Sequence, residues 1–200
     1  MKSEFDAKAR EWDNNKTHID RSIVIAAEIE KEFPAGSKLK ALEYGAGTGL
    51  LSFQLKDKLK EVVLMDNSTE MIKVCEEKKE YYKTSHFRPI VFDLEHNDFN
   101  EKFDIIYTQM VMHHVSNIDQ ILQKFEKMLN PKGILAIVDL YLEDGSFHGP
   151  EVKVHHGFDP EKLKNTLLQK GFNTGEHKQC FVIKRPSGED YPIFLLIVKK

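Results

Sequence analysis

Cysteine is scarce in this sequence, which narrows the compartment in which the chain is expected to fold. Its 200 residues include two cysteines, Cys75 and Cys180, which form neither a C-x-x-C pair nor a disulfide ladder. Disulfides persist mainly in oxidising compartments. A reduced, cytoplasmic setting is therefore the simpler prediction, with packing as the role of both thiols.

Long apolar runs are also missing. No stretch approaches the roughly eighteen consecutive apolar residues of a membrane-spanning helix. The N-terminal segment MKSEFDAKAREWDNN is charged and lacks the apolar core of a secretory signal. No membrane partner is expected, and the cytoplasm is again favoured.

Neither sign of charge dominates. The formal net charge is −3, with acidic and basic residues interspersed, so a nucleic-acid partner is not expected and a small neutral or polar molecule fits better. The hydrophobic content of 40% is enough for one sizeable core, and no low-complexity linker divides the chain. Residues 1–200 are predicted to form one domain, and the oligomeric state is left open.

Three glycines at alternate positions, Gly45, Gly47 and Gly49, form the most informative feature that is present. They follow an apolar run at 39–44 and precede a helical apolar pattern, which predicts a strand, a tight turn and a helix. Glycine permits positive φ and close approach of a ligand to the backbone, and the helix start offers unpaired N–H groups. The turn is therefore predicted to bind a ligand.

The spacing of this turn restricts the ligand. Leu50 stands where a dinucleotide fingerprint has its third glycine, and Glu43 lies two residues before the first glycine. A carboxylate at that place would repel a pyrophosphate and suit a positively charged ligand. The next predicted strand, 62–65, ends at Asp66, where an acidic side chain can bind ribose hydroxyls. Together these features indicate a nucleoside without a pyrophosphate.

The segments LEYGAGTG and VVLMDNS resemble those of class I S-adenosylmethionine-dependent methyltransferases, and the order of elements agrees over nearly the whole chain. The resemblance implies a Rossmann-like, doubly wound, seven-stranded and mostly parallel α/β sheet with an antiparallel C-terminal hairpin. It also implies S-adenosylmethionine as cofactor, with a site made by Trp12, Glu43, Gly45, Ala46, Gly47, Asp66, Asn67, Met71, Asp93, Leu94 and Gln109.

Within that site, the resemblance assigns Glu43 to the methionyl ammonium, directly or through water, and Asp66 to the ribose. Asp93 would accept a hydrogen bond from the adenine amino group while the backbone of Leu94 serves the ring, and Gln109 would offer its carbonyl. For Met71, packing in the core is an alternative, because methionine at helical spacing is often a core residue.

Two helices are predicted before the sheet, within residues 1–36. The pattern F-D-x-x-A-x-x-W-D in the first resembles the N-terminal cap of small-molecule methyltransferases, where it covers the cofactor or the acceptor. This implies a place for Phe5 at the substrate and for Trp12 at the cofactor. An equally weighted alternative is that both rings only dock the helix on the core.

The later helices and strands are predicted from helix-capping residues, hydrophobic periodicity and turn residues such as glycine and proline. Ser68, Ser116 and Asp159 are predicted to cap helices, and the helix after Ser116 is predicted to stop at 130–133. Further strands are predicted at 87–92, 103–107, 134–140, 174–184 and 191–198, the last two forming a hairpin. Residues 141–157 lack a clear period, and we predict a substrate lid there.

Histidines are the candidate catalytic groups, since imidazole titrates near neutral pH. The predicted catalytic residues are His113 and His114, in a segment similar to the L-H-H-V of many small-molecule methyltransferases, and His148 in the lid. A structural hydrogen bond is the favoured alternative for the first two. Phe147, His155 and His156 are predicted to face the substrate. No metal is predicted, because there is no H-E-x-x-H or cysteine-rich set and adjacent histidines point apart on regular backbone. Metal-assisted O-methylation is kept as a minor alternative.

These features predict an enzyme that transfers a methyl group from S-adenosylmethionine to a small molecule by in-line displacement. The alternative is a non-catalytic module that binds S-adenosylmethionine or serves a regulatory role. A nicotinamide oxidoreductase is disfavoured by Leu50 and Glu43. Methylation of nucleic-acid bases is not supported, because no Asn-Pro-Pro turn follows the fourth predicted strand and neither cysteine follows proline. The acceptor atom is not determined by the sequence.

Overall fold

The computed structural model describes residues 5–149 and 151–200, and these divide into two compact units, with the boundary between Asp93 and Leu94. The strands form a seven-stranded mixed sheet in the order β3-β2-β1-β4-β5-β7-β6, which confirms the predicted fold class. The strands are β1 (Leu39–Tyr44), β2 (Leu59–Asp66), β3 (Phe87–Val91), β4 (Phe103–Gln109), β5 (Leu129–Leu140), β6 (Thr174–Lys184) and β7 (Asp190–Lys199). The helices are η1 (Asp6–Asn14), α1 (Lys16–Glu30), α2 (Leu50–Gln54), α3 (Thr69–Tyr82), η2 (Met112–His114), α4 (Ile118–Met128) and α5 (Pro160–Gln169), where η marks 3-10 geometry.

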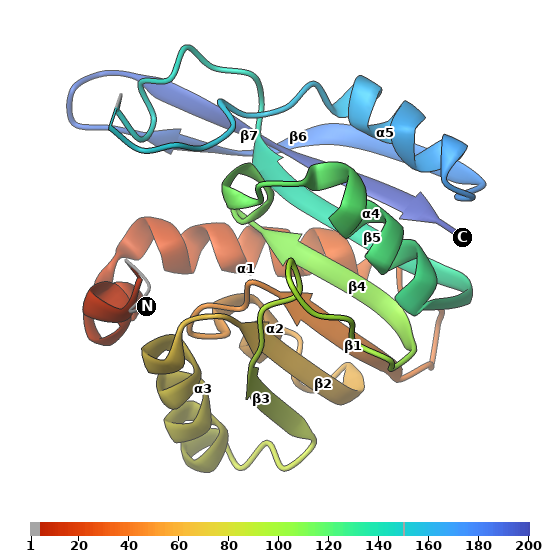
Figure 1. Cartoon of the computed structure of the whole chain (residues 1–200). Coiled ribbons are helices and arrows are strands. Elements are labelled where there is room, and N and C mark those ends of the chain that lie inside the picture. Colours follow the sequence, from red (N-terminus) through yellow and green to blue (C-terminus); the bar gives the residue numbers. More distant parts are fainter. Residues whose placement is uncertain (1–4, 150) are drawn as a thin grey trace. The chain divides into compact units, whose positions relative to one another are not determined.

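The first unit is built on three parallel strands, β1 paired with β2 and β2 with β3. Their central residues, such as Leu42, Val63 and Leu64, are completely buried, as expected for parallel strands covered on both faces. Helix α3 contacts β2 and β3, and Figure 1 shows it beside them. Its N-cap is Ser68, as predicted, because the Ser68 hydroxyl accepts a hydrogen bond from the Met71 N–H.

The glycine turn between β1 and α2 has the predicted strand-turn-helix form. Gly45, Gly47 and Gly49 have φ values of 66°, 54° and 74°, a region that suits glycine. A Cβ on Gly49 would lie 3.0 Å from the Phe53 ring and 3.3 Å from Leu64. Side chains are therefore excluded here both by the backbone conformation and by the packing below the turn.

The second unit joins a parallel pair to an antiparallel hairpin. Strand β4 runs parallel to β5, and β7 pairs antiparallel with both β5 and β6, which confirms the predicted C-terminal hairpin. Helix α5 contacts β6 and β7, and α4 contacts β5 (Figure 1). Asp159 caps α5 as predicted, since its carboxylate accepts the N–H groups of Glu161 and Lys162.

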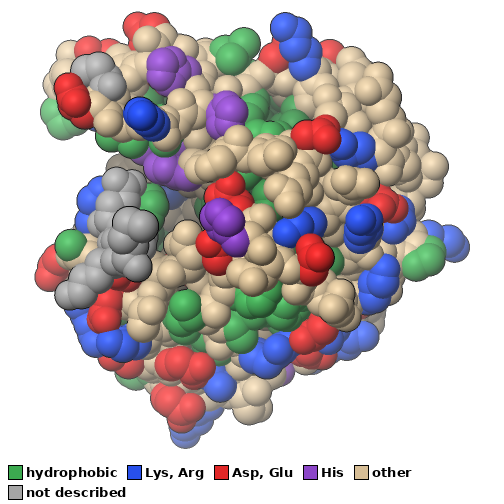
Figure 2. Space-filling model, viewed as in Figure 1, with side chains coloured by type: hydrophobic (Ala, Val, Ile, Leu, Met, Phe, Trp, Pro, Cys, Tyr) green, Lys and Arg blue, Asp and Glu red, His purple; other side chains and the backbone are tan. Residues whose placement is uncertain are grey.

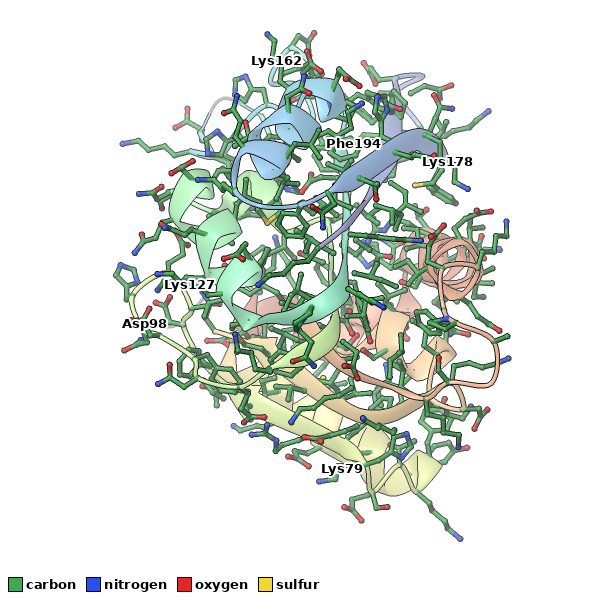
Figure 3. All side chains as sticks on the ribbon, turned by 90° about the vertical axis from the view of Figure 1, so that its right-hand side faces the viewer. Lys79, Asp98, Lys127, Lys162, Lys178 and Phe194 are labelled. Atoms are coloured by element: carbon green, nitrogen blue, oxygen red, sulfur yellow. The ribbon has the colours of Figure 1, made fainter. Side chains whose placement is uncertain are left out.

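Charges of both signs are interspersed over the face shown in Figure 2, in keeping with the sequence pattern. Figure 3 shows Lys127 and Lys162 extending outward from α4 and α5. Phe194, in contrast, is completely buried on β7. Within the described ranges, no helix combines the length and the apolar character that crossing a membrane requires.

Both ends of α4 differ from the sequence predictions. The cap of α4 is Asn117 and not Ser116, because the Asn117 side chain reaches the Gln120 N–H at 3.1 Å. The N–H of Ser116 instead donates to the carboxylate of Glu95 at 2.8 Å. The same helix ends at Met128, so that β5 begins at Leu129, before the predicted stop. The two helices predicted within residues 1–36 are confirmed, and residues 1–4 of that range lie outside the described residues.

Candidate functional site

Asp66 joins the glycine turn to the start of α3. One of its carboxylate oxygens accepts the Gly47 N–H at 2.8 Å, and the other accepts the Ser68 N–H at 2.8 Å. Burial raises the pKa of Asp66, and the hydrogen bonds from the backbone of Ser68 and Gly47 act against that rise. Each carboxylate oxygen has a second lone pair, so the group can still accept a ligand hydroxyl. The acidic residue is thus fixed beside the turn, and its contact with a ribose stays a prediction.

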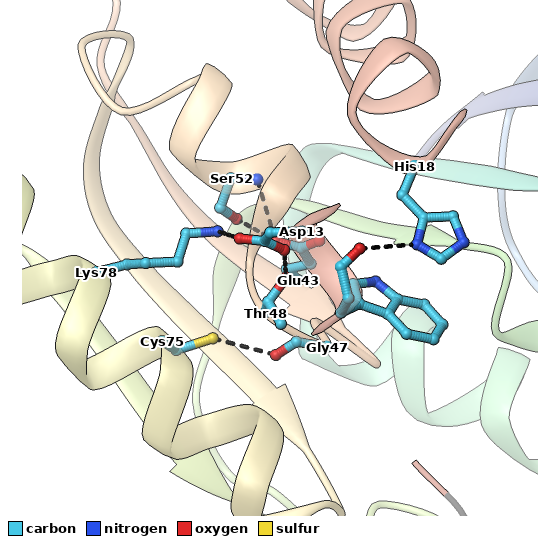
Figure 4. Close-up of polar contacts among 9 residues, drawn as sticks. Asp13, His18, Glu43, Gly47, Thr48, Ser52, Cys75 and Lys78 are labelled. Carbon is cyan, nitrogen blue, oxygen red and sulfur yellow. Dashed lines mark hydrogen bonds and ion pairs between the residues drawn. The ribbon is translucent and has the colours of Figure 1, made fainter. Parts of the chain in front are cut away.

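Two aspartates fasten η1 to this region. Asp13 accepts the Thr48 hydroxyl at 2.5 Å and pairs with the Lys78 ammonium at 2.8 Å, as Figure 4 shows. Asp6 accepts the Ser68 hydroxyl at 2.6 Å. Sequence reasoning missed the roles of both aspartates, although each follows an aromatic residue in the F-D-x-x-A-x-x-W-D pattern. The N-terminal cap is therefore held on the glycine turn by side chains and not by apolar docking alone.

Trp12 and Met71 both lie close to Gly47 of the glycine turn. A Cβ added to Gly47 would be 3.9 Å from the Trp12 indole nitrogen and 4.0 Å from the Met71 sulfur. The Trp12 ring also packs against His18, at 4.3 Å between centroids, and edge-on against Phe5 at 6.1 Å. The structure thus brings together three predicted cofactor residues. These contacts are compatible with a site role and with docking of the helix.

Glu43 lies beneath the turn and is only 3% exposed. Its carboxylate accepts the hydroxyl of Ser52 at 2.5 Å and the Ser52 N–H at 3.2 Å (Figure 4). Burial raises the pKa of Glu43 to about 7, although the Ser52 hydrogen bonds and the charge of Lys78 lower it. Glu43 therefore titrates near neutral pH, and a bound cation would favour its charged form.

Cys75 supports the turn from α3. Its buried thiol donates a weak hydrogen bond to the Gly47 carbonyl at 3.1 Å, and burial raises the pKa of the thiol well above its ordinary value. An inert packing role follows, as the sequence indicated.

The other predicted cofactor residues divide between the two units. Gly45 and Ala46 lie in the turn, and Asn67 follows Asp66 directly. Asp93 is the last residue of the first unit, while Leu94 begins the second unit and Gln109 ends β4. The Leu94 carbonyl accepts the Lys124 ammonium at 2.8 Å. The contacts of these residues with a cofactor stay predictions.

A second group of functional side chains lies within the second unit and centres on His113. Asp139, completely buried near the end of β5, accepts His113 Nδ1–H at 2.6 Å and the His113 backbone N–H at 3.2 Å. Because a carboxylate oxygen here must face a donor, the proton of His113 lies on Nδ1 and the lone pair on Nε2. His148 Nε2 lies 3.0 Å from that nitrogen.

Sequence reasoning missed Asp139, although a signal was present. Residues 134–140 are otherwise apolar, and Asp139 is the exception. A carboxylate in a buried strand needs a partner, and its partner is the histidine of a neighbouring segment.

His114 completes the group. Its ring centroid lies 4.3 Å from that of His113 and 4.9 Å from that of His148. The premise that adjacent histidines point apart was wrong, because His113 and His114 lie on a 3-10 turn and not on regular strand or helix. The three predicted catalytic residues are therefore brought together.

The described part of residues 141–157 is a loop held at several points. His155 donates its backbone N–H to the His113 carbonyl at 2.8 Å, and its Nε2 lies 3.0 Å from the Val115 carbonyl. Phe147 packs edge-on against His148 at 4.8 Å between centroids. The His156 carbonyl accepts the Glu143 N–H at 3.0 Å. Figure 2 shows histidine side chains gathered on the upper part of the face viewed. Contact of these residues with a substrate stays a prediction.

Sequence comparisons agree with the fold. Residues 35–183 match the model of a family described as a methyltransferase domain. An uncharacterized methyltransferase of Staphylococcus carnosus is 30% identical over 168 residues, which cover 82% of this chain and 76% of the relative. An uncharacterized methyltransferase of Schizosaccharomyces pombe is 28% identical over 157 residues, 70% of this chain and 55% of the relative. The chain thus spans about half the length of the latter relative.

A solved structure is also similar. Phosphoethanolamine N-methyltransferase 2 of Haemonchus contortus, in complex with S-adenosyl-L-methionine, matches with a TM-score of 0.74 and 15% identity. The match covers 99% of this chain and 60% of that chain. At this identity the likeness concerns the fold alone.

Proposed function

Because the chain belongs to the class I S-adenosylmethionine-dependent methyltransferase family, we propose that it transfers a methyl group from S-adenosylmethionine to a small-molecule acceptor. The observation that carries this proposal is the Asp66 carboxylate, hydrogen-bonded to the Gly47 N–H of the glycine turn. That arrangement suits a ribose hydroxyl beside a backbone that a ligand can approach closely.

The proposed cofactor contacts start from this arrangement. Asp66 binds the ribose, and Glu43 helps to orient the methionyl ammonium, directly or through water. Gly45 and Gly47 leave room for the methionyl group, while Trp12 and Met71 flank it. The adenine is assigned to Asp93 and Leu94, and Gln109 contributes its carbonyl.

The reaction depends mainly on how the acceptor and the methyl group are positioned relative to each other. The acceptor's lone pair attacks the methyl carbon in line, the carbon–sulfur bond breaks with its electrons going to sulfur, and the acceptor loses a proton. Correct orientation can lower such a barrier by roughly 7–11 kcal/mol. A general base adds roughly 3–5 kcal/mol. Binding residues therefore dominate the proposed catalysis, and a base matters for hydroxyl or thiol acceptors.

His148 is the proposed base. A neutral His148 can take up a proton on its unprotonated ring nitrogen, and its Nε2 lies 3.0 Å from Nε2 of His113, whose ring is hydrogen-bonded to Asp139. His113 then acts as a positioning residue, and His114 is a neighbouring proton acceptor. Phe5, Phe147, His155 and His156 are the residues proposed to contact the acceptor. A cytoplasmic location and the lack of a nucleic-acid partner belong to the same proposal.

The test is a transfer assay. Purified protein is incubated with methyl-labelled S-adenosylmethionine and a panel of small hydroxyl, amine and thiol compounds. Label transferred to at least one class supports the proposal. The alternative, a non-catalytic S-adenosylmethionine-binding or regulatory module, predicts tight binding of the cofactor with no labelled product from any class.

A further inference from the structure

Three imidazoles meet in the second unit, and we infer that His113, His114 and His148 bind a divalent transition-metal ion of the zinc class. One ligand nitrogen from each histidine lies within 4.8 Å of the other two. His113 is buried, and the other two are partly buried. The residues come from two segments, η2 and the loop after β5, so the fold and not local sequence creates the cluster.

Asp139 gives the cluster the outer support typical of metal centres. Its buried carboxylate accepts His113 Nδ1–H at 2.6 Å, which leaves Nε2 free of a proton and directed at His148. In metal sites the histidine ligand commonly donates its second ring N–H to such a carboxylate, which fixes the ring and makes the ligating nitrogen more basic. Asp139 also neutralises part of the ion's charge.

The distances fit a tetrahedral site after small side-chain movements. Zinc–nitrogen bonds of about 2.05 Å place two ligand nitrogens about 3.4 Å apart. His113 Nε2 and His148 Nε2 are 3.0 Å apart, so they need to separate only slightly. The ligand nitrogen of His114 lies within 4.8 Å of the other two nitrogens, and its side chain must move toward them. Three protein ligands leave a fourth position open for water or another ligand.

The donor set selects the kind of metal. Neutral imidazole nitrogens suit Zn²⁺, Co²⁺, Ni²⁺ and Cu²⁺, whereas Mg²⁺ and Ca²⁺ prefer oxygen ligands. Arg185 is a nearby cation, whose guanidinium lies 4.9 Å from the Phe147 ring beside His148. The positive charge of Arg185 would repel the metal ion, and the negative charge of the buried Asp139 carboxylate offsets that repulsion.

Metal binding and the proposed base role of His148 exclude each other, because a neutral imidazole has one available ring lone pair, which cannot bind the ion and accept a proton at the same time. When His148 binds the ion through Nε2, its proton lies on Nδ1, so the imidazole stays neutral. An acceptor hydroxyl or thiol would then be polarised at the open position of the ion. The metal inference does not rest on the proposed transferase activity, since binding is measured without methyl donor or acceptor.

The experiment titrates the full chain, first treated with chelator and desalted, with Co²⁺ and then with Zn²⁺. We expect one Co²⁺ per chain with the intense visible absorption of tetrahedral coordination, displacement by Zn²⁺ and no displacement by Mg²⁺. A pale octahedral spectrum, absence of binding, or displacement by Mg²⁺ would overturn the inference.

Variants locate the site. His148→Ala, on a loop, is expected to weaken Co²⁺ binding by tenfold or more, and Asp139→Asn, which acts through His113, by about tenfold to hundredfold. His177→Ala is the matched control, because His177 lies on β6 and contacts Glu161 at 3.2 Å, outside the cluster. It should bind Co²⁺ like the wild type. Equal affinity of His148→Ala and wild type would contradict the inference, and circular dichroism verifies that each variant is folded.

Discussion

The two candidate sites differ in how their residues reach one another. In the first unit, the glycine turn, Glu43 and Asp66 lie at the ends of two adjacent parallel strands, and each strand end is fixed by its own apolar run. In the second unit, Asp139, His113 and His148 come from a strand, a 3-10 turn and a loop, and hydrogen bonds between side chains assemble them. The first site depends on backbone geometry, whereas the second depends on a chain of polar contacts. Substitutions should therefore damage the two sites in different ways.

Removal of Asp139 should have the largest effect on the fold. Asp139→Ala leaves His113 Nδ1–H and the backbone N–H groups of His113 and Leu140 without their acceptor. A buried donor left without its acceptor costs about 1–3 kcal/mol, so the free energy of unfolding should fall by about 3 kcal/mol or more. Urea denaturation measures this. The control is Asp119→Ala, whose carboxylate is 74% exposed beside Lys170, and its effect should stay below about 1 kcal/mol.

Loss of the proposed base tests the second site without removing its support. His148→Ala should lower kcat by about a hundredfold or more for a hydroxyl or thiol acceptor, because the proposed general base is then missing. The affinity for S-adenosylmethionine should not change. The assay contains a chelator, so that no metal replaces the imidazole. A wild-type kcat would remove His148 from the chemistry.

Asp66→Ala should weaken cofactor binding at the first site, with a smaller effect than the two substitutions above. The loss of one hydrogen bond to a charged group weakens cofactor binding by about 1.5–3 kcal/mol. Calorimetric titration with S-adenosylmethionine measures this. Because Asp66 also holds Gly47 and Ser68, the variant's unfolding must be measured beside it. A folded variant with unchanged affinity would refute the placement of the ribose.

Glu43 predicts a pH dependence of the stability of the first unit. The pKa of Glu43 is raised to about 7 in the folded chain, so between its unfolded value of 4.5 and pH 7 the folded state holds more protons. Stability attributable to this residue therefore falls as pH rises through that window.

The variant Glu43→Gln removes this titration. Relative to it, the wild type should lose about 2 kcal/mol of unfolding free energy between pH 5 and pH 7.5. Any constant cost of the substitution cancels, since the same variant is compared at both pH values. A parallel pair of stability curves would show that Glu43 is ionised throughout.

The contrast also explains which features the sequence could predict. Strand β1, the Ser68 and Asp159 caps and the C-terminal hairpin depend on neighbouring residues, and local patterns predicted them. The contacts of Asp13 with Thr48 join residues 35 positions apart, and those of Asp139 with His113 join residues 26 apart. Such pairings arise only when the chain has folded, so periodicity and motifs could not predict them.

The same reason accounts for the error about adjacent histidines. Alternation of side chains holds on a strand, but Met110, just before η2, has a φ of 59° and the backbone leaves regular geometry there. The residue types at positions 110–114 do not predict this departure from regular backbone geometry. Each of the three histidines was predicted as a candidate residue, but only the structure shows that they lie close together.

The most direct test of the central claim is calorimetric titration of the wild-type chain with S-adenosylmethionine and, separately, with NADH. We predict saturable binding of S-adenosylmethionine and no heat from NADH, because the turn with Glu43 and Leu50 suits a cationic nucleoside and not a pyrophosphate. Binding of NADH without binding of S-adenosylmethionine would contradict the account.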